Sequence, residues 1–190
     1  LSKTDKFLIL NFLAAIKIHN RYGMGAELES LIGYQFHDRS LLEEALEEAG
    51  PQTEGNERLA LLGDKVLSLM LLHRWYMEET PLVGLTAALD IVLNLYHAEQ
   101  GTNLLQIYAG NKHLISRARA LDFPKFVIQR LDIKRSVPDH TLATTVKAIL
   151  GAVWLDSEES VRNVKNSMER IGLYPPEISL YPPKFGNQKQ

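Results

Sequence analysis

A long apolar stretch with one carboxylate in it constrains the fold of this chain more than any other feature. Residues 54–79 predict a single helix, entered at a turn, with apolar side chains on most of its faces. Asp64 lies inside this helix, among leucines. A carboxylate in apolar surroundings is costly unless a cation pairs with it. Asp64 is therefore expected either to bind a cation or to lie near the surface.

The composition is that of an ordinary globular protein and excludes several kinds of site. Of the 190 residues, 45% are apolar and 23% are charged, and this length favours a single domain with a substantial core. The chain has no cysteine, which excludes a disulfide scaffold, a zinc–thiolate site and a cysteine nucleophile. His97, His113 and His140 show no metal-like spacing.

Helix patterns follow one another along the rest of the chain and predict an all-α fold. Ser40 is expected to cap the helix that follows it, with Glu43 as its capping-box partner. Gly101 is expected to break a helix, and Asn111 to cap a basic one. The other expected helices span 4–19, 26–32, 41–49, 84–99, 103–109, 111–120, 124–131, 139–156 and 158–171.

Charge is unevenly distributed, although the net charge is only −2. Residues 27–64 carry ten Asp/Glu and two Lys/Arg, whereas residues 111–135 carry seven Lys/Arg and two Asp. A basic face is compatible with phosphate binding, and it is equally what an ordinary solvated face looks like. The candidate phosphate-binding residues, which the resemblance described below would make RNA-binding, are Lys112, Arg117, Arg119, Lys125, Arg130, Lys134 and Arg135.

A second apolar stretch, residues 141–156, completes a pattern with the first. Together they resemble the catalytic domain of the ribonuclease III family, whose signatures run E-R-L-E-F-L-G-D-x-V-L and L-A-D-x-x-E-A-x-x-G-A-x-x-L-D. The resemblance covers roughly residues 26–170 and implies the family's all-α endonuclease-domain fold. The matching framework residues are Glu57, Arg58, Leu59, Leu62, Gly63, Asp64, Val66, Leu67, Leu142, Ala143, Ala148, Gly151, Ala152, Leu155 and Asp156.

The resemblance also implies a magnesium site, from which this chain departs. In the family, four carboxylates in two pairs, each pair on one helix face, hold Mg²⁺. The matching positions here are Ala60, Asp64, Thr144 and Lys147, so three of the four ligands are replaced. This predicts a chain with no metal, no cofactor and no enzymatic activity. Lys147 is expected to stand in the metal's place and neutralise Asp64; the alternative is that it extends to solvent.

The resemblance further implies a twofold dimer, with a homodimer and a heterodimer with another ribonuclease III-like protein both open. Leu61 takes the place of the aromatic knob at the family's interface, and the expected interface residues are Leu61, Leu62 and Lys65. The alternative is that the domain's own helices cover this surface.

The expected domain organisation has three parts. Residues 1–25 form a helical extension, 26–171 the ribonuclease III-like domain, and 172–190 an extended tail with two Leu-Tyr-Pro-Pro segments. The helix at 4–19 is too short for a confident membrane span and lacks the features of a secretory signal, so no membrane contact is expected. Leu1 leaves a cleaved targeting segment open.

Three functional readings follow from the resemblance. The first is a non-catalytic structural or RNA-binding subunit of a ribonucleoprotein, similar to members in the large subunit of the mitochondrial ribosome, with a mitochondrial location. The second is an active double-stranded-RNA endonuclease with relocated metal ligands, drawn from Glu57, Asp64, Asp139 and Asp156. The third is a protein–protein dimerisation module without RNA, which the net charge of −2 favours.

Overall fold

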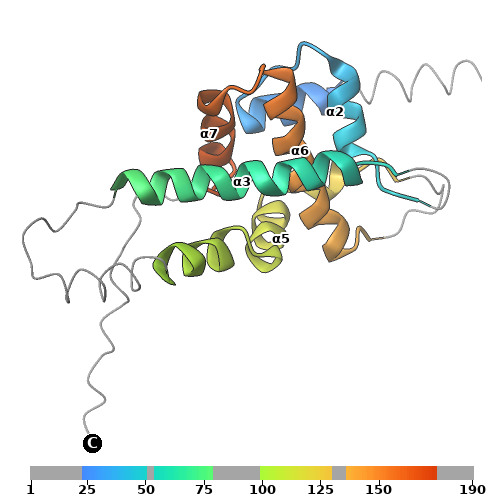
Figure 1. Cartoon of the computed structure of the whole chain (residues 1–190). Coiled ribbons are helices and arrows are strands. Elements are labelled where there is room, and N and C mark those ends of the chain that lie inside the picture. The colour runs from blue at the N-terminus through green and yellow to red at the C-terminus, as the bar shows by residue number, and fades with distance from the viewer. Residues whose placement is uncertain (1–22, 51–53, 79–98, 130–135, 175–190) are drawn as a thin grey trace, which may run out of the picture.

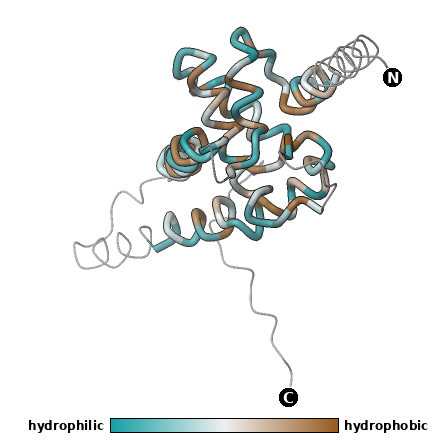
Figure 2. Tube along the Cα trace, turned by 90° about the vertical axis from the view of Figure 1, so that its right-hand side faces the viewer, coloured by the Kyte–Doolittle hydropathy of each residue, from teal (hydrophilic) through white to brown (hydrophobic). Residues whose placement is uncertain are grey.

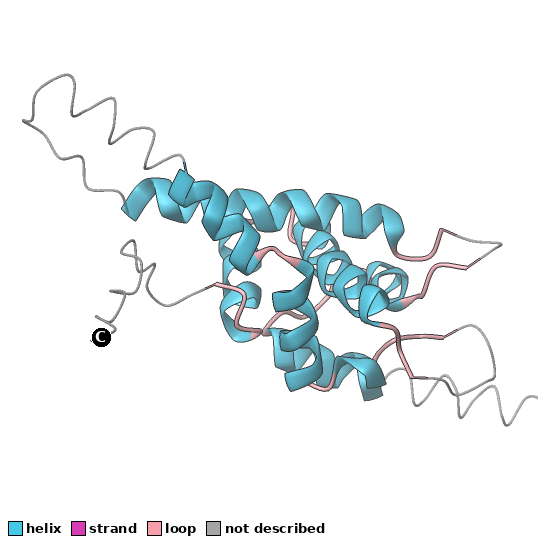
Figure 3. Ribbon diagram, turned by 90° about the horizontal axis from the view of Figure 1, so that it is seen from below, coloured by secondary structure: helices cyan, strands magenta, loops and turns pink. Residues whose placement is uncertain are grey.

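The described part of the chain consists of helices and the loops between them. A computed structural model describes residues 23–50, 54–78, 99–129 and 136–174 (Figure 1). Within these ranges no strand occurs (Figure 3), and the one isolated bridge joins Glu47 to Ile128. This confirms the all-α prediction. The helices are 23–32, α2 (Arg39–Leu46), α3 (Glu57–Glu78), 99–108, α5 (Asn111–Ala120), the 3₁₀ turn η1 (Phe123–Lys125), α6 (Asp139–Asp156) and α7 (Val161–Arg170).

Helix α6 is the centre of the domain. It contacts α2, α3, α5 and α7, and its contact with α3 is the most extensive of these. In Figure 1, α3 lies across the molecule with α2 and α7 above it and α5 below it, and α6 crosses it. Eleven residues of α6 are buried, as expected of a helix that is apolar on most faces. The outer helices alternate apolar and hydrophilic residues (Figure 2). None of the described helices is long and apolar enough to cross a membrane.

Two glycines allow α3 and α6 to cross at backbone distance. A β-carbon on Gly63 would overlap the main chain of Lys147, and one on Gly151 would overlap the main-chain carbonyl of Leu59. Because backbone atoms cannot rotate out of the way as a side chain does, both positions need glycine for this crossing. The crossing brings the residue after Gly63, which is Asp64, to the side chain of Lys147.

The C-terminal end of α6 is tied to the loop that precedes α2. The side chain of Asp156 is only 2% exposed and accepts hydrogen bonds from the Tyr34 hydroxyl at 2.7 Å and from the main-chain N–H groups of His37 at 2.9 Å and Asp38 at 2.8 Å. Asp38 in turn caps α2, because its carboxylate accepts from the Ser40 main-chain N–H at 2.8 Å. The prediction of Ser40 as the cap was therefore wrong by two residues.

Two further helix predictions are corrected. Gly101 does not break a helix; it lies within 99–108, against the Trp75 ring. Over residues 124–129, the described part of the helix expected at 124–131, the chain forms the end of η1 and an extended segment instead. In that segment the Ile128 main-chain N–H donates to the Leu46 carbonyl at 2.8 Å, and its carbonyl accepts from the Glu48 N–H at 3.2 Å. Because the Ile128 N–H and carbonyl are bonded to the end of α2, they are not available for the hydrogen bonds of a helix.

Several predictions lie outside the described residues. They are the helix at 4–19, most of the helix at 84–99 and the extended tail beyond residue 174. The division into an extension, a domain and a tail stays a prediction. The helices expected at 54–79, 111–120, 139–156 and 158–171 are confirmed, with differences of a few residues at their ends.

Candidate functional site

Asp64 on α3 is held by two ammonium groups, and the predicted pair with Lys147 is present. The Lys147 Nζ lies 3.0 Å from Asp64 Oδ1, and the Lys65 Nζ lies 3.0 Å from Oδ2. The Asp64 side chain is 29% exposed. Burial tends to raise its pKa, but the hydrogen bonds and positive charges of Lys147 and Lys65 together lower the pKa below the ordinary value. Asp64 is therefore an ionised carboxylate with both oxygens engaged.

Lys147 is anchored by a second acceptor on another helix. Its Nζ donates to Asn111 Oδ1 at 3.1 Å, and its side chain is only 19% exposed. Asn111 was predicted to cap α5; it is instead the first residue of that helix, and Gly110 occupies the capping position. The alternative in which Lys147 extends to solvent is wrong, because the ammonium group points to α3 and α5 at once.

The other two positions of the implied metal site carry no ligand for a cation. Ala60 is buried and offers only a methyl group. The Thr144 hydroxyl donates to the His140 carbonyl one turn earlier at 2.9 Å. Mg²⁺ requires near-octahedral oxygen ligands, whereas this site presents one carboxylate and two ammonium groups. Within the described ranges, no group of three or more acidic or histidine side chains is placed to hold a metal ion. The residues present do not fit Mg²⁺.

The acids considered as relocated ligands are not gathered around Asp64. Asp139 begins α6 and forms an ion pair with Arg119. Asp156 ends the same helix, about 25 Å away along its axis at 1.5 Å per residue, and is buried against Tyr34. Glu57 begins α3, about 10 Å along the axis from Asp64, and lines an open pocket with His140 and Thr144.

Sequence reasoning missed two buried polar residues elsewhere in the domain. The Asn56 side chain, immediately before α3, donates to the Ala45 carbonyl at 2.9 Å and to Thr145 Oγ1 at 3.3 Å. Glu29 accepts from the Phe36 main-chain N–H at 2.9 Å and from the Arg39 guanidinium at 3.0 Å. Both fix one segment against another. The sequence indicated these contacts only by placing a polar residue, Asn56 or Glu29, next to a stretch of apolar residues.

Four of the predicted RNA-binding residues lie in the part of the chain that the structure describes, and their role in RNA binding stays a prediction. Arg117 Nε donates to the Ile171 carbonyl at 2.9 Å, Arg119 binds Asp139, and Lys125 binds Glu27 at 2.8 Å. Lys112 is exposed on α5. Three members of the set, Arg130, Lys134 and Arg135, lie outside the described residues.

Helix α3 carries four exposed apolar side chains. Leu61 is 69% exposed, as are Tyr76 and Met77, and Leu69 is 53% exposed. Of the predicted interface residues, Leu61 and Lys65 point outward, whereas Leu62 is half-buried against the core. Exposed apolar side chains such as Leu61 are suited to contact with a second subunit.

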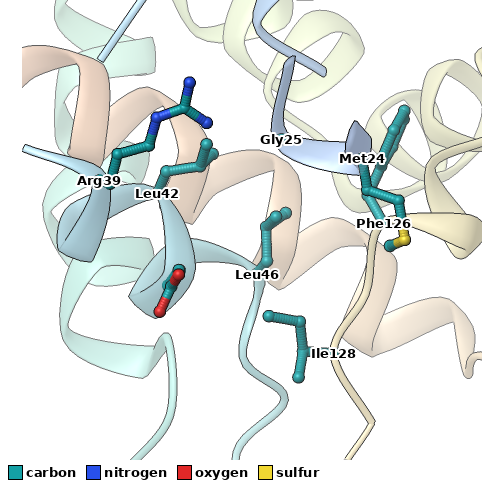
Figure 4. A pocket seen from close by; sticks show the side chains of 8 residues that line it. Met24, Gly25, Arg39, Leu42, Leu46, Phe126 and Ile128 are labelled. Carbon is teal, nitrogen blue, oxygen red and sulfur yellow. The ribbon is translucent and has the colours of Figure 1, made fainter. Parts of the chain in front are cut away.

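A separate apolar pocket opens between helix 23–32, α2 and the segment after η1 (Figure 4). Leu42, Leu46, Phe126 and Ile128 line it, with Met24 at one end. None of the residues that line it belongs to the Asp64 site.

Comparisons with known proteins agree with this arrangement. The family described as "Ribonuclease III domain" matches residues 57–158, more than half of the chain. Ribonuclease 3 of Aliivibrio fischeri is 33% identical over 168 residues, a match that covers 83% of this chain and 67% of that protein. Ribonuclease 3 of Idiomarina loihiensis is 28% identical over 163 residues, a match that covers 83% of this chain and 62% of that protein.

Solved structures have the same fold. The nuclease domain of ribonuclease III from Campylobacter jejuni superposes with a TM-score of 0.61 at 21% identity, covering 80% of this chain and 97% of that one. A second structure of that nuclease domain, with a TM-score of 0.59, is described by its flexibility in a region involved in dimer formation.

These relatives correct one prediction. The expectation that the chain has no enzymatic activity was wrong, because the proteins it matches are named Ribonuclease 3. The replaced carboxylates are a local difference within a match that covers most of the chain. The likeness to mitochondrial ribosomal proteins stays a prediction. By the match of its two signature helices and by its fold, the chain belongs to the ribonuclease III domain family.

Proposed function

We propose that this chain acts on double-stranded RNA as a dimer of ribonuclease III domains. The observation that carries the proposal is the family match over residues 57–158, because this segment contains both α3 and α6 and hence the whole Asp64 site. The exposed apolar side chains of α3 support the dimer. The chain spans only 62% of the length of one Ribonuclease 3 that it matches, so the substrate and the activity are carried over as a proposal.

Binding is tested with a short RNA duplex, the matching single strand and a DNA duplex of the same sequence. We expect the RNA duplex to bind most tightly and its affinity to fall as salt rises, since phosphate contacts release counterions. Equal binding of all three nucleic acids, or of none, would overturn the proposal.

Lys112 and Arg162 provide a matched pair of variants for that assay. Both are exposed cations, on α5 and α7 respectively. Lys112→Ala is expected to weaken duplex binding and to lower the salt slope by about one, because α5 adjoins the Asp64 site through Asn111. Arg162→Ala is expected to leave the duplex affinity and the salt slope unchanged.

Hydrolysis of the duplex is a second candidate function, and the names of the relatives favour it. Asp64 is the acidic residue at the site that matches the family's pattern. The assay compares the wild-type chain with Asp64→Asn on an end-labelled duplex. Cleavage products from the wild type alone, with RNA binding retained in the variant, support hydrolysis; a wild-type chain that binds the duplex and yields no products contradicts it.

A place in a ribonucleoprotein, including the mitochondrial ribosome, stays a prediction. Purification of the native complex would support it if a defined RNA and a second ribonuclease III-domain protein came with the chain. A chain recovered as a homodimer without RNA would contradict it.

A further inference from the structure

The Asp64 site already contains its own counter-charge. Both oxygens of the carboxylate are within 3.0 Å of an ammonium group, one from Lys147 and one from Lys65. With all three groups ionised, the cluster carries a net charge of +1. A site that gathers divalent cations needs the opposite sign, because two or more carboxylates must offset the charge of the ion.

The two lysines are held differently. The Lys65 side chain is 74% exposed, so water can replace Asp64 as the partner of its ammonium group. The Lys147 ammonium lies between Asp64 Oδ1 and Asn111 Oδ1, at 3.0 Å and 3.1 Å, and these acceptors come from two different helices. The main chain of Lys147 is packed against Gly63 at the crossing, so its Cα is fixed as well.

A divalent ion that bound Asp64 Oδ1 would have to displace Lys147. The incoming ion would meet the charge of the ammonium at short range, where repulsion is strong in partly buried surroundings. It would gain no further ligand from Ala60 or from the Thr144 hydroxyl, which is bonded to the His140 carbonyl. The displaced ammonium would also lose its bond to Asn111.

We infer that the ammonium group of Lys147 occupies the cation position of this site and that Mg²⁺ or Mn²⁺ does not bind at Asp64. In this domain a lysine side chain supplies the positive charge that a bound metal ion would supply in the family's site. The inference rests on family membership and on the geometry of the site, and it holds whether or not double-stranded RNA is the substrate.

The test is Mn²⁺ binding followed by electron paramagnetic resonance, with the full chain and no RNA. The wild type is expected to bind no more Mn²⁺ than Asp64→Asn at millimolar metal. Mn²⁺ bound by the wild type and lost in Asp64→Asn would overturn the inference. Because this comparison needs no rebuilt site, it stays decisive if more heavily substituted variants do not fold.

A rebuilt site gives the converse result. The triple variant Ala60→Glu, Thr144→Asp, Lys147→Glu restores four carboxylates on the two facing helices, and it is expected to bind Mn²⁺. Adding Asp64→Asn to it is the matched control and should weaken that binding at least tenfold. A folded triple variant that binds no more Mn²⁺ than the wild type would count against Lys147 as the group that excludes the ion.

RNA cleavage gives an independent readout. If the wild-type chain cleaves a duplex in the presence of EDTA, cleavage needs no metal at Asp64, as the inference expects. Cleavage that EDTA abolishes, together with Mn²⁺ bound by the wild type and not by Asp64→Asn, would contradict it. Failure of the chain to bind RNA would overturn the proposed function and leave the Mn²⁺ result intact, so the two proposals fail separately.

Discussion

Gly63 on α3 packs against the main chain of Lys147 on α6, so closely that a methyl group at Gly63 would overlap the Lys147 carbonyl. This contact sets the separation of the two helices that carry the family's signatures. It also places Asp64, the next residue, within 3.0 Å of the Lys147 ammonium. The packing of the core and the chemistry of the site therefore depend on one helix crossing.

Replacing Gly63 by alanine is expected to separate α3 from α6. Overpacking a well-filled core costs about 1–3 kcal/mol, and we expect a loss at the upper end of this range because the clash is with backbone. Urea unfolding measures it. Gly23→Ala is the matched control, since nothing lies within 4 Å of a β-carbon at that position; a similar loss in both variants would refute the account of the crossing.

Lys147 and Asp64 are expected to be coupled in stability. Removing one partner of a fully buried ion pair costs on the order of 3–5 kcal/mol. This pair is partly exposed, so Lys147→Met is expected to cost about 1–3 kcal/mol. Lys65→Met, which removes the exposed partner, should cost less than about 1 kcal/mol.

A double-mutant cycle isolates the pair. The variants Asp64→Asn, Lys147→Met and the double variant are compared by urea unfolding, and their effects should not add. Additive losses would show that the two charges do not stabilise each other.

Asp156 is expected to make the domain sensitive to acid. Burial tends to raise its pKa, but hydrogen bonds from the N–H groups of Asp38 and His37 and from the Tyr34 hydroxyl together lower the pKa below its ordinary value. An unfolded Asp has a pKa of about 3.9. The carboxylate therefore stabilises the fold fully above about pH 4, and this stabilisation is lost as the pH falls through the lower folded-state pKa.

Unfolding by urea at about pH 6 and about pH 3 measures this effect. The wild type should lose more stability between the two values than Asp156→Asn. Asp139→Asn serves as the control, because Asp139 is an exposed acid on the same helix. An Asp156→Asn variant with the same pH dependence as the wild type would contradict the assignment.

Leu61 is expected to support self-association. It is 69% exposed on α3, and Leu61→Glu would place a charge in an apolar interface, where it is costly unless paired. Sedimentation equilibrium should show a dimer for the wild type and a monomer for the variant. Ile107→Glu, at another exposed apolar residue, should remain dimeric; a monomeric wild type would exclude the α3 interface.

The sequence was sufficient for the helices whose apolar pattern is long. Residues 57–78 and 139–156 were predicted almost to their ends, since a helix buried on most faces leaves little ambiguity. The pairing of Lys147 with Asp64 also followed, because the two signature positions must face each other. Its second acceptor, Asn111, did not follow, because sequence alone does not show where α5 begins relative to α6.

The failures occur where tertiary contacts override local pattern. The segment after Pro124 has helical composition, but its backbone groups bond to the end of α2 around Leu46 and Glu48 instead. Ser40 has a good capping side chain, yet Asp38 is the residue fixed beside Asp156 and so becomes the cap.

The measurement that tests the central claim most directly is a crystal structure of the wild-type chain soaked in MnCl₂, with data collected for the anomalous signal of manganese. The account predicts no manganese peak at the Asp64 carboxylate and the Lys147 ammonium within hydrogen-bond distance of it. A Mn²⁺ ion ligated by Asp64, with the Lys147 side chain turned away from α3, would contradict it.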